Sequence, residues 1–294
     1  MVRYDTDNLQ QRVESISRKW WFFLFLLLLQ FIPPFTAEPV SPEQAGWVVG
    51  AVLSEAIVYD LIMLFPLFKI LAILMILSLV ALRNKASKAF SIYAGISYTL
   101  FAFLQSIAFT EEFGFAVLTL NLVMFLLVAM IWFWEAKAQR NDFTTPHLSL
   151  SRVWVIPFAF LAFWYPIDLD TMAMDFNPLL LVTSMAGLAF CLMTPIFLSI
   201  LIIFFPSINV ATLRVTSTIG IVISFYNILV NFFMFPELLF WNGVLHIPLI
   251  VLSVYGFILS FRHKTTSTSP AAKRKLQFPD EEITPSVTAQ LWLI

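Results

Sequence analysis

Five polar side chains in this sequence lie within long apolar runs, where lipid would offer them no hydrogen-bond partner. A lysine at the centre of a membrane helix costs about 2.5–3.5 kcal/mol unless it is paired or reaches the headgroups. Polar side chains in such helices therefore turn toward the protein interior. We expect the five to line one polar cleft, and the alternative is that they join helices by hydrogen bonds. They are Lys69, Gln105, Asn227, Asn231 and His246.

Two carboxylates, Glu55 and Asp60, precede Lys69 in the sequence and are candidate charge partners for it. An opposite charge beside the ammonium group would offset the cost of removing it from water. The alternative is that the long lysine side chain snorkels to the nearer headgroups.

A second acidic group lies in the stretch PIDLDTMAMD, which contains Asp168, Asp170 and Asp175. Carboxylate oxygens are the ligand type that Ca²⁺ and Mg²⁺ take in proteins. No glycine-rich loop accompanies these residues to fix their geometry, so solvated loop charge is the competing interpretation of this candidate metal site.

The sequence lacks the phosphate-binding loop G-x-x-x-x-G-K-[ST], the serine-hydrolase elbow G-x-S-x-G and the zinc-protease motif H-E-x-x-H. Of His147, His246 and His263, only His246 lies inside a predicted membrane helix. A bis-histidine haem is therefore excluded, and we expect no cofactor. The sequence favours a protein without catalytic activity, because no acid, base and nucleophile converge.

The composition is typical of a membrane protein. Hydrophobic residues make up 60% of the chain and charged residues 12%, against roughly 45–50% and 25% in soluble domains. The formal net charge of −1 argues against nucleic acid as a partner. We expect the lipid bilayer as the main partner, with other membrane subunits or further copies of this chain beside it.

The apolar runs predict an all-α protein with eight transmembrane helices. Every Lys and Arg except Lys69 falls on one side of these helices, and the positive-inside rule makes that side cytoplasmic. Both termini are therefore predicted to be cytoplasmic, and the protein to lie in the cell membrane. The predicted crossings are at about 20–34, 61–82, 90–109, 113–134, 153–167, 178–205, 215–235 and 239–261.

Residues 44–82 are too many for a single crossing. We expect a crossing at 61–82 that is kinked at Pro66. Three interpretations of residues 44–58 stay open: an interfacial helix, a re-entrant helix, or the start of one long kinked helix.

Two similar stretches indicate an internal repeat, since SRKW at 17–20 and SRVW at 151–154 each begin a predicted crossing. Four crossings return the chain to its starting side, so two such units would be parallel repeats (4+4) related by an axis along the membrane normal. The prolines Pro66 and Pro195 each lie in the second crossing of their half. The predicted parts are a cytoplasmic N-terminus at 1–14, four-helix repeats at 15–140 and 151–264, a cytoplasmic linker at 141–150 and a disordered cytoplasmic tail at 265–294.

Two functions fit this architecture. The preferred one is a small transporter or permease with a polar cleft between the two four-helix halves. The alternative is a non-catalytic membrane subunit or anchor of a larger complex, which could lie next to a quinone. Architecture alone does not imply function, so the polar residues must decide between the two.

Overall fold

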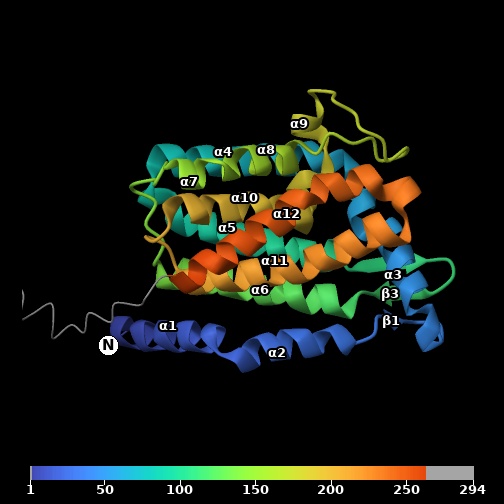
Figure 1. Cartoon of the computed structure of the whole chain (residues 1–294), viewed down its shortest axis with the longest axis horizontal. Helices are drawn as coiled ribbons and strands as arrows, with labels where there is room; N and C mark the ends of the chain where they lie inside the picture. The colour runs from blue at the N-terminus through green and yellow to red at the C-terminus, as the bar shows by residue number, and fades with distance from the viewer. Residues whose placement is uncertain (1, 263–294) are drawn as a thin grey trace, which may run out of the picture. The chain divides into compact units, whose positions relative to one another are not determined.

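The computed structural model describes residues 2–262, which form a helical bundle with a small sheet at one end (Figure 1). The predicted tail at 265–294 lies outside these described residues. The chain begins with α1 (Val2–Arg18) and α2 (Trp20–Leu28), which follow one another along the bundle and end in the short turn η1 (Leu29–Phe31). The predicted all-α class is confirmed.

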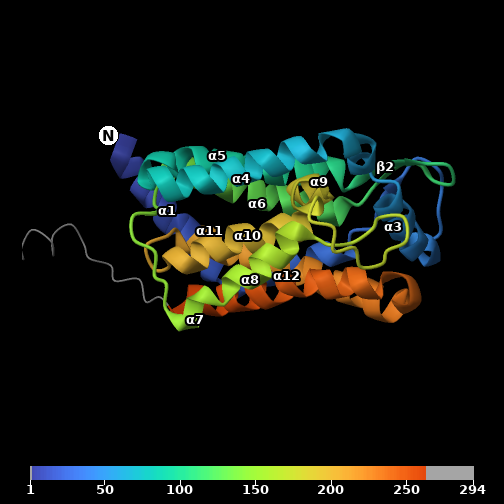
Figure 2. The same ribbon diagram turned by 90° about the horizontal axis from the view of Figure 1, so that it is seen from above.

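Seven further helices complete the bundle. Figure 2 shows α4 and α5 along one side and α8 and α12 along the other, with α10 between them. This central position agrees with the burial of most side chains of α10. The seven are α4 (Phe65–Leu82), α5 (Asn84–Leu104), α6 (Thr119–Ala138), α8 (Val155–Trp164), α10 (Phe190–Phe204), α11 (Val210–Ile228) and α12 (Pro236–Arg262).

Four helical segments of the described chain are long and apolar enough to cross a membrane, so the predicted membrane class is supported. They are Ile57–Leu82, Thr119–Ala138, Val210–Met234 and Pro236–Arg262. A fifth arises if two helical segments that meet at a 94° bend are counted as one broken span. The remaining short helical elements are η3 (Ile57–Leu64), α7 (Leu150–Val153), α9 (Leu180–Thr183), η4 (Met185–Leu188) and the π-helix η5 (Leu229–Met234).

A three-stranded antiparallel sheet corrects the boundaries of the third and fourth predicted crossings. Its strands are β1 (Phe35–Thr36), β2 (Ile107–Thr110) and β3 (Gly114–Val117), in the order β1-β3-β2. Residues 107–109 and 114–117 were expected to be helical, but short runs with aromatic and β-branched residues also favour strands. Gly114 adopts a φ of +63°, which glycine reaches without steric cost. As a consequence α6 begins later than expected and continues to Ala138.

The segment before α4 is also irregular. Residues 45–54 form the separate short helix α3 (Ala45–Ser54), which packs through Val48 and Val52 on the hairpin formed by β2 and β3. The alternative in which residues 44–58 begin one long kinked helix is therefore wrong. The 3-10 turn η2 (Pro42–Gln44) precedes it. The predicted kink at Pro66 is wrong as well, because this proline lies in the first turn of α4. A proline there removes no helical hydrogen bond.

Aromatic side chains fill the core between α5, α6 and α10. The ring of Phe197 lies 5.9 Å from that of Phe90, 5.4 Å from that of Tyr98 and 5.7 Å from that of Trp132, measured between centroids. All four side chains are buried. This cluster fixes the three helices relative to one another, because tilted and edge-to-face rings pack in a limited set of geometries.

The contact between α11 and α12 depends on two glycines, each of which faces a serine on the other helix. A Cβ atom at Gly220 would lie 2.2 Å from the Oγ of Ser253, and one at Gly256 would lie 2.5 Å from the Oγ of Ser217. Small residues at both crossing points let the two backbones approach closely, as in many membrane helix pairs.

Candidate functional site

A chain of hydrogen-bonded, partly buried polar groups joins the end of α8 to α10, α11, η5 and α12 in the second predicted half. The Tyr165 hydroxyl donates to Oδ1 of Asn242 (2.7 Å), and Nδ2 of Asn242 donates to Oδ1 of Asn231 (2.8 Å). Nδ2 of Asn231 donates to the Asn227 carbonyl (2.7 Å), and Nδ2 of Asn227 contacts Sγ of Cys191 (3.4 Å). We call these five residues the asparagine chain.

Helical spacing places these side chains. Asn227 and Asn231 are four residues apart on α11 and η5, and Asn242 and His246 are four apart on α12, so each pair shares one helical face. Nδ1 of His246 lies 2.6 Å from the Asn242 carbonyl oxygen, and its ring meets that of Tyr165 edge-on at 6.3 Å. Asn231 belongs to the π-helix, a rare form that is frequent at functional sites.

Tyr165 also lines a pocket of about 430 Å³. The pocket lies between the start of α4, with Phe65 and Pro66, and the segment that follows α8. Its volume falls in the range of small-molecule sites, which is roughly 300–1,000 Å³. The wall combines apolar side chains with three carboxylates and two further hydroxyl residues: Ile62, Phe65, Pro66, Ile167, Leu169, Leu180 and Met185, with Asp168, Asp170 and Asp175, and with Thr183 and Ser184.

The structure brings together three of the five predicted cleft residues, namely Asn227, Asn231 and His246. Lys69 lies elsewhere: its side chain is fully buried, and Nζ donates to the carbonyl of Phe163 and lies 3.8 Å from the centroid of that ring. Phe163 is in the last turn of α8, whose carbonyls have no partner within the helix. Lys69 therefore caps this helix.

Gln105 also caps a helix: its Oε1 accepts a hydrogen bond from the backbone N–H of Phe190, the first residue of α10 (2.8 Å). The expected pairing of Lys69 with Glu55 or Asp60 is wrong: both acids are exposed, and neither forms a salt bridge with Lys69. A carbonyl at the negative end of a helix takes the place of the expected carboxylate.

The three aspartates of the candidate metal site do not form a metal-binding group among the described residues. Oδ1 of Asp168 instead accepts from the backbone N–H and hydroxyl of Thr171 and from the N–H of Asp170. The N–H of Thr171 is the main cause that lowers the pKa of Asp168 below its ordinary value. These aspartates therefore organise a loop and give the pocket negative charge.

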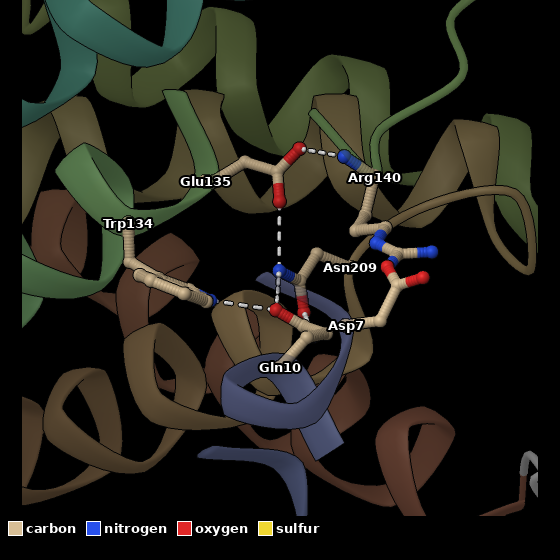
Figure 3. A network of polar contacts seen from close by, with 6 residues as sticks. All are labelled: Asp7, Gln10, Trp134, Glu135, Arg140 and Asn209. Atoms are coloured by element: carbon tan, nitrogen blue, oxygen red, sulfur yellow. Dashed lines mark hydrogen bonds and ion pairs between the residues drawn. The ribbon is translucent and has the colours of Figure 1, made fainter. Parts of the chain in front are cut away.

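A second polar network, which local sequence spacing does not predict, surrounds Glu135 near the end of α6 that lies away from the sheet (Figures 1 and 3). The Glu135 side chain is completely buried. Its Oε1 accepts from the backbone N–H of Arg140 (2.8 Å) and of Asn141 (2.7 Å), and its Oε2 accepts from Nδ2 of Asn209 (2.7 Å). No salt bridge to Glu135 is present in residues 2–262.

Helix α1 joins this network through Gln10, as Figure 3 shows. Nε2 of Gln10 donates to Oδ1 of Asn209 (2.8 Å), and Oε1 of Gln10 accepts from Nε1 of Trp134 (2.6 Å). An exposed salt bridge between Asp7 of α1 and Arg140 lies beside them. We refer to Asp7, Gln10, Trp134, Glu135, Arg140 and Asn209 as the Glu135 network.

Comparison with known proteins adds no relative: no protein-family model matches the chain, and no curated protein or solved structure is similar enough to count as a match. The function must therefore be inferred from the two polar networks and the pocket.

Proposed function

We propose that this protein is a small membrane transporter that takes up organic cations through the pocket next to Tyr165. This proposal rests on one observation: Tyr165 lines the pocket, and its hydroxyl also donates the first hydrogen bond of the asparagine chain. A solute in the pocket is thus next to a row of hydroxyl and amide groups that leads between α10, α11 and α12. Polar groups in that position reduce the cost of moving a polar solute through hydrocarbon.

The pocket wall defines the class of solute. Asp170 and Asp175 supply negative charge, while Phe65, Leu169 and Met185 supply apolar surface. An amine with an apolar body satisfies both, because the ammonium group meets the carboxylates and the body displaces water from the apolar wall. The asparagine chain lies within the second predicted half, so the proposed path differs from the cleft between the two halves that the sequence predicts. The pocket itself has walls from both halves.

Binding and uptake of 2-phenylethylamine by the purified protein in proteoliposomes test this proposal, with 2-phenylethanol as the uncharged analogue. We expect the amine to bind and the alcohol not to. Replacing both Asp170 and Asp175 by Asn should weaken amine binding about tenfold, since an exposed charge contributes up to about 1 kcal/mol. Tyr165→Phe should keep binding and reduce uptake at least tenfold, because the ring stays while the donor to Asn242 is lost.

Glu111→Gln is the matched control, since this exposed acid lies on the hairpin and does not line the pocket. It should leave binding and uptake unchanged. Equal binding of amine and alcohol, or no effect of the two Asn substitutions, would contradict the proposal.

The non-catalytic membrane subunit remains the second candidate, and one observation favours it. The amide nitrogens of Asn227, Asn231 and Asn242 all donate to groups of the protein itself, as expected of residues that join helices. If the protein is such a subunit, Tyr165→Phe should lower the melting temperature, and amine uptake should be the same in the variant and the wild type.

For the topology we propose that all eight predicted crossings span the cell membrane and that both termini are cytoplasmic. In support, each of the eight predicted segments overlaps a helix, although the bounds differ: α2, α4, α5, α6, α8, α10, α11 and α12. The predicted 4+4 repeat stays a prediction. In its favour, α5 packs on α6 as α11 packs on α12. Against it, Pro66 starts its helix whereas Pro195 lies inside α10.

Thiol labelling in intact cells checks the orientation. Cysteines introduced at Ser41 and Thr171, both exposed, should react with a membrane-impermeant reagent. A cysteine at Thr145, exposed in the segment between α6 and α7, should react only after the membrane is permeabilised. The basic residues on the Thr145 side are the reason for this assignment. Labelling of position 145 in intact cells would reverse the proposed topology.

A further inference from the structure

The imidazole ring of His246 carries a hydrogen-bond acceptor that no group in residues 2–262 uses. Nδ1 of His246 lies 2.6 Å from the carbonyl oxygen of Asn242, and a carbonyl oxygen can only accept, so Nδ1 carries the hydrogen. No carboxylate pairs with the ring in the described part of the chain, and a partly buried imidazole without a counter-charge is neutral. In the neutral ring the other nitrogen, Nε2, is an acceptor.

A second unused acceptor belongs to Asn227. Its Nδ2 donates to the Ile223 carbonyl (3.1 Å), which fixes the orientation of the amide. Oδ1 of Asn227 then accepts from no group among residues 2–262, whereas both ends of the Asn231 and Asn242 amides are bonded. Every amide nitrogen of the asparagine chain therefore has an acceptor, while two acceptors beside it have no donor.

Both acceptors are accessible to a ligand. The partnerless polar atoms that are enclosed in residues 2–262 belong to other side chains, and His246 and Asn227 are each partly exposed. His246 lies ten residues after Pro236, or about 15 Å along α12. An acceptor that faced lipid at this depth of a membrane helix would have no partner, so such groups normally face a cavity or a pathway.

The position of His246 connects it with the pocket. Its ring meets that of Tyr165 edge-on, with 6.3 Å between the centroids, and Tyr165 lines the pocket. His246 also lies one helical turn beyond Asn242, which accepts from the Tyr165 hydroxyl. The next acceptor beyond the pocket wall is therefore Nε2 of His246.

We propose that His246, and after it Asn227, bind the ammonium group of the solute through its N–H bonds, so that the protein takes up amines that carry an N–H and rejects quaternary ammonium ions. This inference rests on the proposed function and names its substrates more narrowly. A quaternary nitrogen has the same charge as a protonated amine and no hydrogen to donate. The aspartates of the pocket attract both ions, whereas only the protonated amine satisfies Nε2 of His246.

Two compounds of equal charge and nearly equal size test the inference: N,N-dimethyl-2-phenylethylamine and N,N,N-trimethyl-2-phenylethylammonium. They differ only in that a methyl group replaces the N–H of the first. We expect similar binding to the purified full-length protein. Uptake into proteoliposomes should be at least about tenfold faster for the tertiary amine, the effect of one hydrogen bond to a charged group. Vesicles without protein give the passive rate, which is subtracted.

Substitutions of His246 assign the selectivity to its ring. His246→Leu removes the acceptor and should lower uptake of the tertiary amine to the rate of the quaternary ion, with binding retained. His246→Gln places an amide oxygen near the position of Nε2 and should keep most of the preference. His147→Leu is the matched control, since this histidine is exposed in the segment between α6 and α7, and it should change neither rate.

The outcomes separate this inference from the proposed function. Equal uptake of the tertiary and quaternary compounds by the wild type would overturn the inference and leave the transporter standing. A tenfold preference that persists in His246→Leu would also overturn it, because another group would then provide the selectivity. If neither compound is taken up, and 2-phenylethylamine binds no better than 2-phenylethanol, the proposed function fails and this inference fails with it.

Discussion

Replacing Gly220 by leucine is expected to separate α11 from α12 and to lower the free energy of unfolding by about 3 kcal/mol or more. The first added carbon would lie 2.2 Å from Oγ and 3.1 Å from Cβ of Ser253, and 3.6 Å from Cδ1 of Leu249. Rotation of the serine hydroxyl removes only the first of these contacts. The remaining atoms of a leucine side chain then have no space unless the two helices move apart.

Gly50→Leu is the matched control. Gly50 lies in α3, and a Cβ atom there would have no other atom within 4 Å. Leucine also favours helix more than glycine does, so this variant should be as stable as the wild type or slightly more stable. Thermal unfolding of both variants in detergent measures the difference. Equal melting temperatures would show that the glycine contact does not hold the helix pair.

Lys69→Glu is expected to lower the free energy of unfolding by about 3–5 kcal/mol, the range for an uncompensated buried charge. Lys69 is completely buried and caps the last turn of α8 at the Phe163 carbonyl. A carboxylate at this position would face the negative end of the helix dipole and lose the hydrogen bond. Lys69→Met keeps most of the volume without any charge, and should cost about 1 kcal/mol through the lost bond.

Lys88→Glu makes the same charge reversal at an exposed position of α5 and should leave the melting temperature unchanged. If Lys69→Met were as unstable as Lys69→Glu, the loss would come from packing rather than from charge. A stable Lys69→Glu would contradict the capping role.

Two residues of the asparagine chain, Asn227 and Asn231, were expected from their helical spacing to line one cleft with His246. In the structure Asn231 bonds to Asn227, and Asn242 bonds to both Asn231 and His246. Asn242 was missed although it lies four residues before His246, because it falls near the predicted start of a crossing. Lys69 and Gln105 were assigned to the same site wrongly. A buried polar side chain needs a partner, but the partner can equally be an unpaired backbone group at the end of a neighbouring helix.

The Glu135 network was missed for a related reason. The sequence placed a crossing at 113–134, which would leave Glu135 at the membrane surface. The hairpin instead delays the start of α6 to Thr119, so the helix continues to Ala138 and Glu135 is buried. Long-range pairing of Gln10 with Asn209 cannot be read from local spacing, since 199 positions separate them.

The shortness of α8 has a consequence for the bilayer around it. The apolar helix Leu150–Trp164 rises only roughly 1.5 Å per residue, so it is several ångströms shorter than the ordinary hydrocarbon layer of roughly 30 Å. Under the proposed topology, in which α8 crosses the membrane, lipids beside it compress or tilt to match, which thins the membrane locally. Tyr165 is the residue at which α8 ends, so the proposed topology places the pocket beside this thinned region.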